Sequence, residues 1–195
     1  MKLIKKSVQF ITLLLLPILA YAHSEVEGTG FMSGFTHPLT GLDHALAMVS
    51  VGLVSAQIGG RYIWTVPTVF VLSMMISGAM GIFQIPLPFV EQGIAASVVL
   101  LGLAIVLMEK GRGHWVVLLM VAFFGLFHGH AHGTEMPNSA SPIYYGVGFI
   151  FASSMMHVAG ILIGHYATLT ERSAQWLRYI GAVLAGMGLH IFITL

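Results

Sequence analysis

The sequence predicts an all-helical integral membrane protein with six transmembrane helices behind a cleaved signal peptide. Hydrophobic residues make up 57% of the 195-residue chain and charged residues only 8%, whereas soluble globular domains carry roughly 25% charged residues. Apolar stretches close to the roughly 20 residues that a membrane helix needs recur along the chain. The connections between them are short, so we expect one compact bundle without a separate extramembrane domain.

Residues 1–22 have the pattern of a secretory signal peptide. Three lysines within the first six residues precede a short apolar run at 10–19, and Ala20-Tyr21-Ala22 fits the small-x-small cleavage rule. The alternative is an uncleaved first membrane helix, but an apolar core of about ten residues is too short to span a bilayer comfortably. Cleavage after Ala22 leaves a mature transmembrane domain at 23–195 that begins with His23.

Six apolar segments follow the leader, and each has the length of a membrane helix. They lie at about 38–58, 62–83, 86–108, 114–131, 143–166 and 176–195. The mature basic residues all lie in or beside the first, third and fifth connections, which the positive-inside rule makes cytoplasmic; they are Arg61, Lys110, Arg112, Arg172 and Arg178. A cleaved leader also leaves the mature N-terminus outside the cytoplasm, so both termini are expected there.

Two short patterns recur between the halves of the chain. One is Phe70-x-x-Ser73-Met74-Met75 in the second segment and Phe151-x-x-Ser154-Met155-Met156 in the fifth. The other is Gly102-Leu103-x-Ile105 in the third segment and Gly188-Leu189-x-Ile191 in the sixth. The halves would have opposite orientations, which is the inverted repeat of many secondary transporters. Short matches among such common residues also arise by chance, so the 3+3 repeat is a hypothesis.

The composition excludes several classes of protein and leaves one feature to explain. Without cysteine there is no disulfide framework and no thiolate metal site. The formal net charge is +1 with no basic run beyond residue 6, so no nucleic-acid partner is expected. No phosphate-binding G-x-x-x-x-G-K-[ST] motif is present, so any transport is not driven by this chain's own ATP hydrolysis. Ten histidines in so apolar a chain require a reason.

Three metal-ligand side chains lie within eight residues at the start of the first apolar segment: His37, Asp43 and His44. If the helix starts at Pro38, a residue suited to a first turn, His44 lies about 10 Å further along and on the same face as His37. Asp43 points about 100° away from His44, where it is either a ligand or the acceptor for a histidine ring N–H. Ionisable groups inside a membrane are costly and indicate a functional site.

The fourth segment carries a denser cluster at 125–135. His128 and His132 are four residues apart and share one helix face, which Glu135 extends. Glycines at 125, 129 and 133 form a ridge that lets another helix approach closely, and they also weaken the helix, so part of it is expected to unwind around a site. The first segment runs inward and the fourth runs outward, so both clusters are expected in the outer half of the membrane.

These residues predict a site for one divalent ion. Five groups at one depth exceed what helix packing requires; the predicted ligands are His37, Asp43, His44, His128 and His132. Further candidates for the site or for a pathway are His23, Glu91, His130, Glu135 and His157. At the mature N-terminus, the α-amine and imidazole of His23 are able to chelate one ion together, although this histidine also simply follows the cleavage site. Nitrogen and carboxylate oxygen without thiolate suit nickel, cobalt, zinc or copper(II).

The run His37-Pro-x-x-Gly-x-Asp43-His44-x-Leu-Ala-Met48, followed by Val51-Gly52-Leu53, closely resembles the signature of the HupE/UreJ family. Its members are small bacterial membrane proteins regarded as nickel, and in some cases cobalt, permeases associated with hydrogenase or urease gene clusters. The His-rich fourth segment, the leader and the number of spans also resemble that family. The resemblance implies a secondary transporter that takes up Ni²⁺ or Co²⁺ across the inner membrane, with periplasmic termini and no permanently bound cofactor.

Two other classes remain as alternatives to a transporter. A membrane-embedded metalloenzyme is disfavoured because a hydrolase needs H-E-x-x-H or an equivalent acid and base beside the metal, and neither occurs. A metal sensor or delivery protein without conduction is the other alternative. Metal flux into sealed vesicles that hold only this protein distinguishes a transporter from this second alternative. The sequence does not indicate the energy source or the oligomeric state.

Overall fold

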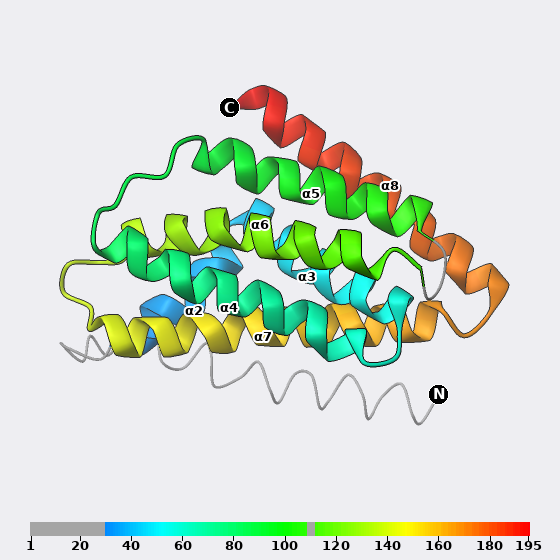
Figure 1. Cartoon of the computed structure of the whole chain (residues 1–195), viewed down its shortest axis with the longest axis horizontal. Helices are drawn as coiled ribbons and strands as arrows, with labels where there is room; N and C mark the ends of the chain where they lie inside the picture. The colour runs from blue at the N-terminus through cyan, green and yellow to red at the C-terminus, as the bar shows by residue number, and fades with distance from the viewer. Residues whose placement is uncertain (1–29, 109–111) are drawn as a thin grey trace.

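The computed structural model describes residues 30–108 and 112–195. These residues form seven helices and no strands (Figure 1): α2 (Phe31–Thr40), α3 (Leu42–Ile58), α4 (Tyr62–Ile82), α5 (Val90–Leu107), α6 (His114–Thr134), α7 (Pro142–Ala167) and α8 (Glu171–Thr194). The predicted signal peptide, His23 and Lys110 lie outside the described residues.

Five of these helices are long and apolar enough to cross a membrane. They correspond to the second to sixth predicted segments. The bent pair of α2 and α3 makes a sixth span if it is counted as one. The all-helical architecture is therefore confirmed for the described residues, and their five or six candidate spans are consistent with a membrane protein. Large apolar side chains such as Leu119 and Ile193 are about 71% exposed on the outside of the bundle, as expected for a surface that faces lipid.

The first predicted helix is wrong in its start and its continuity. The helix begins at Phe31, with Pro38 inside α2 rather than in its first turn. At Gly41 the backbone becomes extended, with φ −82° and ψ 112°, and the axes of α2 and α3 differ by 86°. His37 and His44 therefore lie on two helices and not on one face of a single helix.

Packing against α7 explains why the chain bends here. A Cβ at Gly34 of α2 would overlap the backbone of Tyr145, and a Cβ at Gly148 of α7 would overlap the carbonyl oxygen of Phe31. These two glycines let the backbones of α2 and α7 approach closely. This contact fixes the direction of the α2 axis, so the chain changes direction at Gly41 and α3 begins as a separate helix.

Three other boundaries differ from the predicted ones. The third predicted segment begins at Val90 rather than 86, after a non-helical stretch with two prolines and a positive φ of 59° at Phe89. The sixth begins at Glu171 rather than 176, because the side chain of Thr170 accepts a hydrogen bond from the backbone N of Ser173 in a capping box. The fourth segment extends to Thr134 as one continuous helix, so the predicted unwinding is wrong.

Glycines bring the helices together in pairs. A Cβ at Gly129 of α6 would overlap the carbonyl oxygen of Met74 in α4, and one at Gly160 of α7 would overlap the carbonyl oxygen of Val49 in α3. The predicted glycine ridge of the fourth segment thus serves helix packing. The third close pair is α5 with α8, which lies along it at one edge of the bundle (Figure 1).

Candidate metal centre

Four histidine rings meet at the end of the bundle where α6 ends and α3 begins. The ring of His132 lies 4.8 Å from that of His37 and 4.3 Å from that of His44, measured between centroids. The ring of His44 lies 4.9 Å from that of His128, and all three contacts are edge-on. The bend at Gly41 makes this possible. It lets α2 place His37 at the end of α6, while His44 lies in the first turn of α3.

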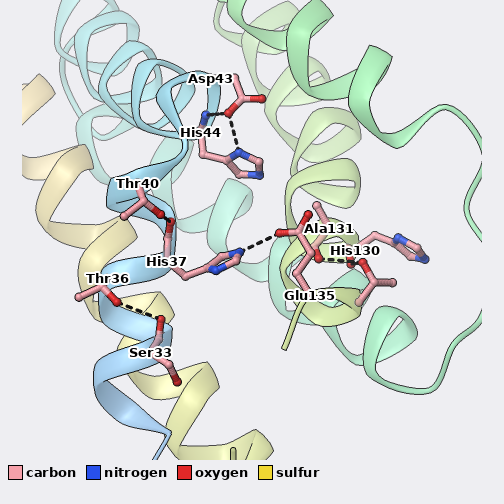
Figure 2. A network of polar contacts seen from close by, with 10 residues as sticks. Ser33, Thr36, His37, Thr40, Asp43, His44, His130, Ala131 and Glu135 are labelled. Carbon is pink, nitrogen blue, oxygen red and sulfur yellow. Dashed lines mark hydrogen bonds and ion pairs between the residues drawn. The ribbon is translucent and has the colours of Figure 1, made fainter. Parts of the chain in front are cut away.

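Near the C-terminal end of α6, the cluster combines two histidines and a carboxylate. The Nε2 of His37 lies 2.8 Å from Oε2 of Glu135 (Figure 2). One potential ligand atom from each of His37, His132 and Glu135 lies within 4.8 Å of the other two. Ligand atoms bound at about 2.1 Å to one ion lie no more than about 4.2 Å apart, so a small closing movement brings this trio to a coordination geometry.

Glu135 follows the last residue of α6 and lies outside the spanning helices. Its hydrogen bond with His37 holds the pKa of the carboxyl below its ordinary value. The oxygen therefore stays negatively charged in mildly acidic solution. A charged oxygen beside two imidazoles favours a divalent cation over a neutral ligand.

Asp43 fixes the orientation of the His44 ring. Its Oδ1 accepts hydrogen bonds from Nδ1 of His44 at 2.9 Å and from the backbone N of the same residue at 2.8 Å (Figure 2). With Nδ1 as donor, the lone pair is on Nε2, which is buried and has no hydrogen-bond partner within the described residues. A carboxylate behind a histidine commonly raises the basicity of a metal ligand. Of the two roles considered for Asp43, this geometry fits the hydrogen-bond acceptor.

Ser97 orients His128 in the same manner. The hydroxyl of Ser97 lies 2.6 Å from the carbonyl oxygen of Ile94 and donates to it, so the serine oxygen accepts from Nε2 of His128 at 2.9 Å. The lone pair of His128 is then on Nδ1, which is buried and unpaired within the described residues. Ser97 was missed by sequence reasoning, because a serine within an apolar helix gives no signal of its partner.

His132 is at the centre of the cluster and has neither ring nitrogen paired within the described residues. It is 2% exposed and also contacts the ring of Phe149, at 4.2 Å between centroids. Buried polar atoms almost always have a partner in folded proteins. Three adjacent buried rings, those of His44, His128 and His132, therefore each carry a nitrogen that has no partner within the described residues and that is a potential metal ligand.

The additional candidates lie in different places. Glu91, in the first turn of α5, is exposed but near enough for its charge to interact with Asp43 and Glu135. His130 points away from the cluster on the far side of α6 (Figure 2), where its Nε2 donates to the carbonyl oxygen of Ile85 at 2.7 Å. It anchors the connection between α4 and α5 rather than joining the other rings. His157 lies apart, beyond the ring of Phe70.

Comparison with known proteins gives one consistent relationship. A family model described as HupE / UreJ protein matches residues 11–191. The curated Protein HupE of Rhizobium leguminosarum bv. viciae is 43% identical over 148 residues, which cover 76% of this chain and 77% of that protein. No solved structure matches at a significant level.

Proposed function

This chain belongs to the HupE/UreJ family, and on that premise we propose that it is a secondary transporter that takes up Ni²⁺. Co²⁺ is the alternative ion. The transported metal supplies a metalloenzyme such as hydrogenase or urease, with which the family is associated. The protein then resides in the bacterial inner membrane with both mature termini in the periplasm.

The observation that carries this proposal is the cluster of unpaired histidine nitrogens beside Glu135 at one end of the bundle. Imidazole nitrogen and carboxylate oxygen without thiolate suit borderline divalent ions such as Ni²⁺ and Co²⁺. Arg61 precedes α4 and Arg112 precedes α6, at the opposite end of these helices from the cluster. The positive-inside rule assigns that opposite end to the cytoplasm, so the histidines face the periplasm.

The geometry supports stepwise binding. His37, His132 and Glu135 form the outer group. His44 and His128, each oriented by a hydrogen bond, form the inner group. The ring of His132 touches members of both groups, so an ion passes from one to the other without losing that ligand. Several adjacent sites of moderate strength suit conduction better than one tight site.

The antiparallel packing of α5 against α8 is compatible with the inverted repeat. A Cβ at Gly102 would lie 2.5 Å from the backbone N of Ala185, and a Cβ at Gly188 would lie 2.6 Å from the backbone N of Val99. Gly102 and Gly188 correspond in the proposed repeat, and each contacts the residue three positions before the other. Any antiparallel pair of helices shows this reciprocity, and a two-fold axis between α5 and α8 is compatible with it. Inverted repeats of this kind underlie alternating access in secondary transporters.

The test is flux of nickel into sealed vesicles that contain only the purified protein. Vesicles with the unaltered protein are expected to accumulate radioactive Ni²⁺, and those with His132→Ala are not. His190→Ala is the matched control, because this histidine is exposed on α8 and far along the chain from the cluster. Nickel binding without flux would indicate a sensor or delivery protein and contradict transport.

A further inference from the structure

One face of α7 leads from the metal centre toward the middle of the bundle. Tyr145, Phe149, Ser153 and His157 follow one another at intervals of four residues, and all four are buried. Such spacing places them in one strip along the helix. At its start, the ring of Phe149 contacts His132 and the ring of Tyr145 lies 6.1 Å from that of His37.

The same strip carries polar atoms without partners. The hydroxyl of Tyr145, the hydroxyl of Ser153 and both ring nitrogens of His157 are buried and unpaired within the described residues. His157 lies about 22 Å along α7 from Pro142 at 1.5 Å per residue, so it is deep within the span. A polar ring at this depth is costly unless it has a functional partner, and packing alone does not require both nitrogens to stay unpaired.

One phenyl ring contacts both His157 and the metal centre. The ring of Phe70 lies 5.3 Å from that of His128 and 5.6 Å from that of His157, measured between centroids. Phe70 is completely buried on α4. It therefore joins the inner end of the imidazole cluster to His157 through two ring contacts. An apolar constriction of this kind gates permeation in many channels.

We infer that His157 is a second, deeper station for the transported divalent ion, and that Phe70 is the barrier between it and the outer centre. This inference rests on the proposed transport function. Ser153, one turn before His157, supplies a second polar atom to an ion at this station. One imidazole and one hydroxyl hold a divalent ion only weakly, so occupancy is brief and the outer centre determines the equilibrium affinity. Movement of the Phe70 side chain opens the step from His128 to His157.

Measurements of Ni²⁺ affinity and of Ni²⁺ uptake distinguish the roles of the outer centre and the deeper station. For His157→Ala, the affinity of the purified protein for Ni²⁺ is expected to stay within twofold of the unaltered protein, while the initial uptake rate falls at least tenfold. His157→Gln keeps an oxygen donor of similar size and is expected to retain an intermediate rate. The matched control is His165→Ala, an exposed histidine two turns further along α7, which should change neither quantity. His132→Ala should lose both.

The outcomes of this experiment are distinct. Uptake at the unaltered rate by both His157 variants, with His132→Ala inactive, would overturn the deeper station and leave the transport proposal intact. Absence of uptake by the unaltered protein would overturn transport and, with it, the station. Loss of nickel affinity in a folded His157→Ala variant would assign His157 to the outer centre instead and overturn the inference.

Thiol labelling tests the path without relying on the His157→Ala variant. Because the chain contains no cysteine, His157→Cys introduces a single thiol. We expect it to react with a small cationic methanethiosulfonate reagent added outside spheroplasts, to react more slowly with saturating Ni²⁺, and to react faster when combined with Phe70→Ala. Leu162→Cys is the control, because this side chain of α7 is 52% exposed on the outside of the bundle and does not line the pocket that His157 lines. Equal unreactivity of the two thiols, or labelling that Ni²⁺ does not slow, would overturn the path.

Discussion

The Nε2 of His37 lies 2.8 Å from Oε2 of Glu135, although the two residues are 98 positions apart in the chain. This contact joins α2, on one side of the bend at Gly41, to the end of α6. It closes the outer end of the histidine cluster and supplies the cluster with a charged oxygen.

Replacing Glu135 with glutamine removes the charge and keeps the shape. Glu135→Gln is expected to lower the affinity for Ni²⁺ at least tenfold, because an amide oxygen is a weaker ligand for a divalent ion than a carboxylate. Glu135→Ala should lower it further, since the acceptor for His37 is also lost. Calorimetric titration of the purified protein measures the effect. Glu171→Gln, an exposed acid at the start of α8, is the control, and equal affinities in all of these proteins would exclude Glu135 as a ligand.

The bend at Gly41 is expected to be intolerant of a side chain for a local reason. A Cβ at this position would lie 3.1 Å from Nδ1 of His44 and 3.3 Å from Oδ1 of Asp43. Gly41→Ala should therefore displace the pair and lower nickel affinity about tenfold while the protein still inserts. Gly146→Ala is the matched control, because nothing lies within 4 Å of the added Cβ. If the two variants bind nickel equally, the position of the Asp43–His44 pair does not set the affinity.

Hydrogen bonds behind the histidines give a third prediction. Asp43→Ala and Ser97→Ala remove the acceptors that orient His44 and His128. Loss of such supporting partners typically costs 10- to 100-fold in metal affinity. The larger loss is expected for Asp43→Ala, since a carboxylate also raises the basicity of its histidine. Ser50→Ala is the control, because this buried serine donates to the backbone carbonyl of Leu46 and contacts no histidine ring through a hydrogen bond among the described residues. Retention of full affinity by both variants would show that the two rings do not bind the ion.

Hydropathy was sufficient to predict the long helices, but it did not predict the bend at Gly41 that brings the candidate ligands together. The second to sixth segments were predicted to within a few residues, because a bilayer demands long apolar runs. The break at Gly41 was missed because a glycine is also tolerated in a continuous helix. What decides the bend is the close contact of Gly34 and Gly148 between α2 and α7, which no local pattern reveals.

The candidate ligands were visible in the sequence, whereas their partners were not. His128 and His132 stand out because their spacing is helical, and the structure places both rings in one cluster. His130 lies between them in the chain but on another face, where Ile85 accepts its N–H. The contact of Phe70 with two histidines depends on how α4 packs between α6 and α7. The signal peptide, the role of His23 and the repeat stay predictions.

Tight helix packing through glycine gives a fourth prediction, on stability. A Cβ at Gly129 would overlap the carbonyl oxygen of Met74, which is backbone and has little freedom to move. Gly129→Ala is expected to lower the free energy of unfolding by about 1–3 kcal/mol, as overpacking does in other cores. Gly186→Ala, where nothing lies within 4 Å of the added Cβ, should be neutral. The apparent melting temperature in detergent measures both, and equal values would contradict the close contact of α4 with α6.

Nickel binding is expected to weaken in acid, and the histidines rather than Glu135 should be responsible. An imidazole binds a metal only when neutral, and an unperturbed ring gains a proton near about pH 6.5, so protons compete with the ion as the pH falls. The carboxyl of Glu135 has a lowered pKa because of its hydrogen bond with His37. It therefore remains charged through the range in which the rings become protonated, and its own protonation comes only at lower pH.

Affinity measured at equilibrium should fall at least tenfold between about pH 7 and pH 5. Glu135→Gln should show the same slope from a lower starting affinity, whereas His37→Ala, which removes the half-buried ring of the trio, should show a shallower one. Binding is measured apart from uptake, because a proton gradient that drives transport would raise the uptake rate in acid. Affinity that stays constant from about pH 8 to pH 5 would contradict ligation by histidine.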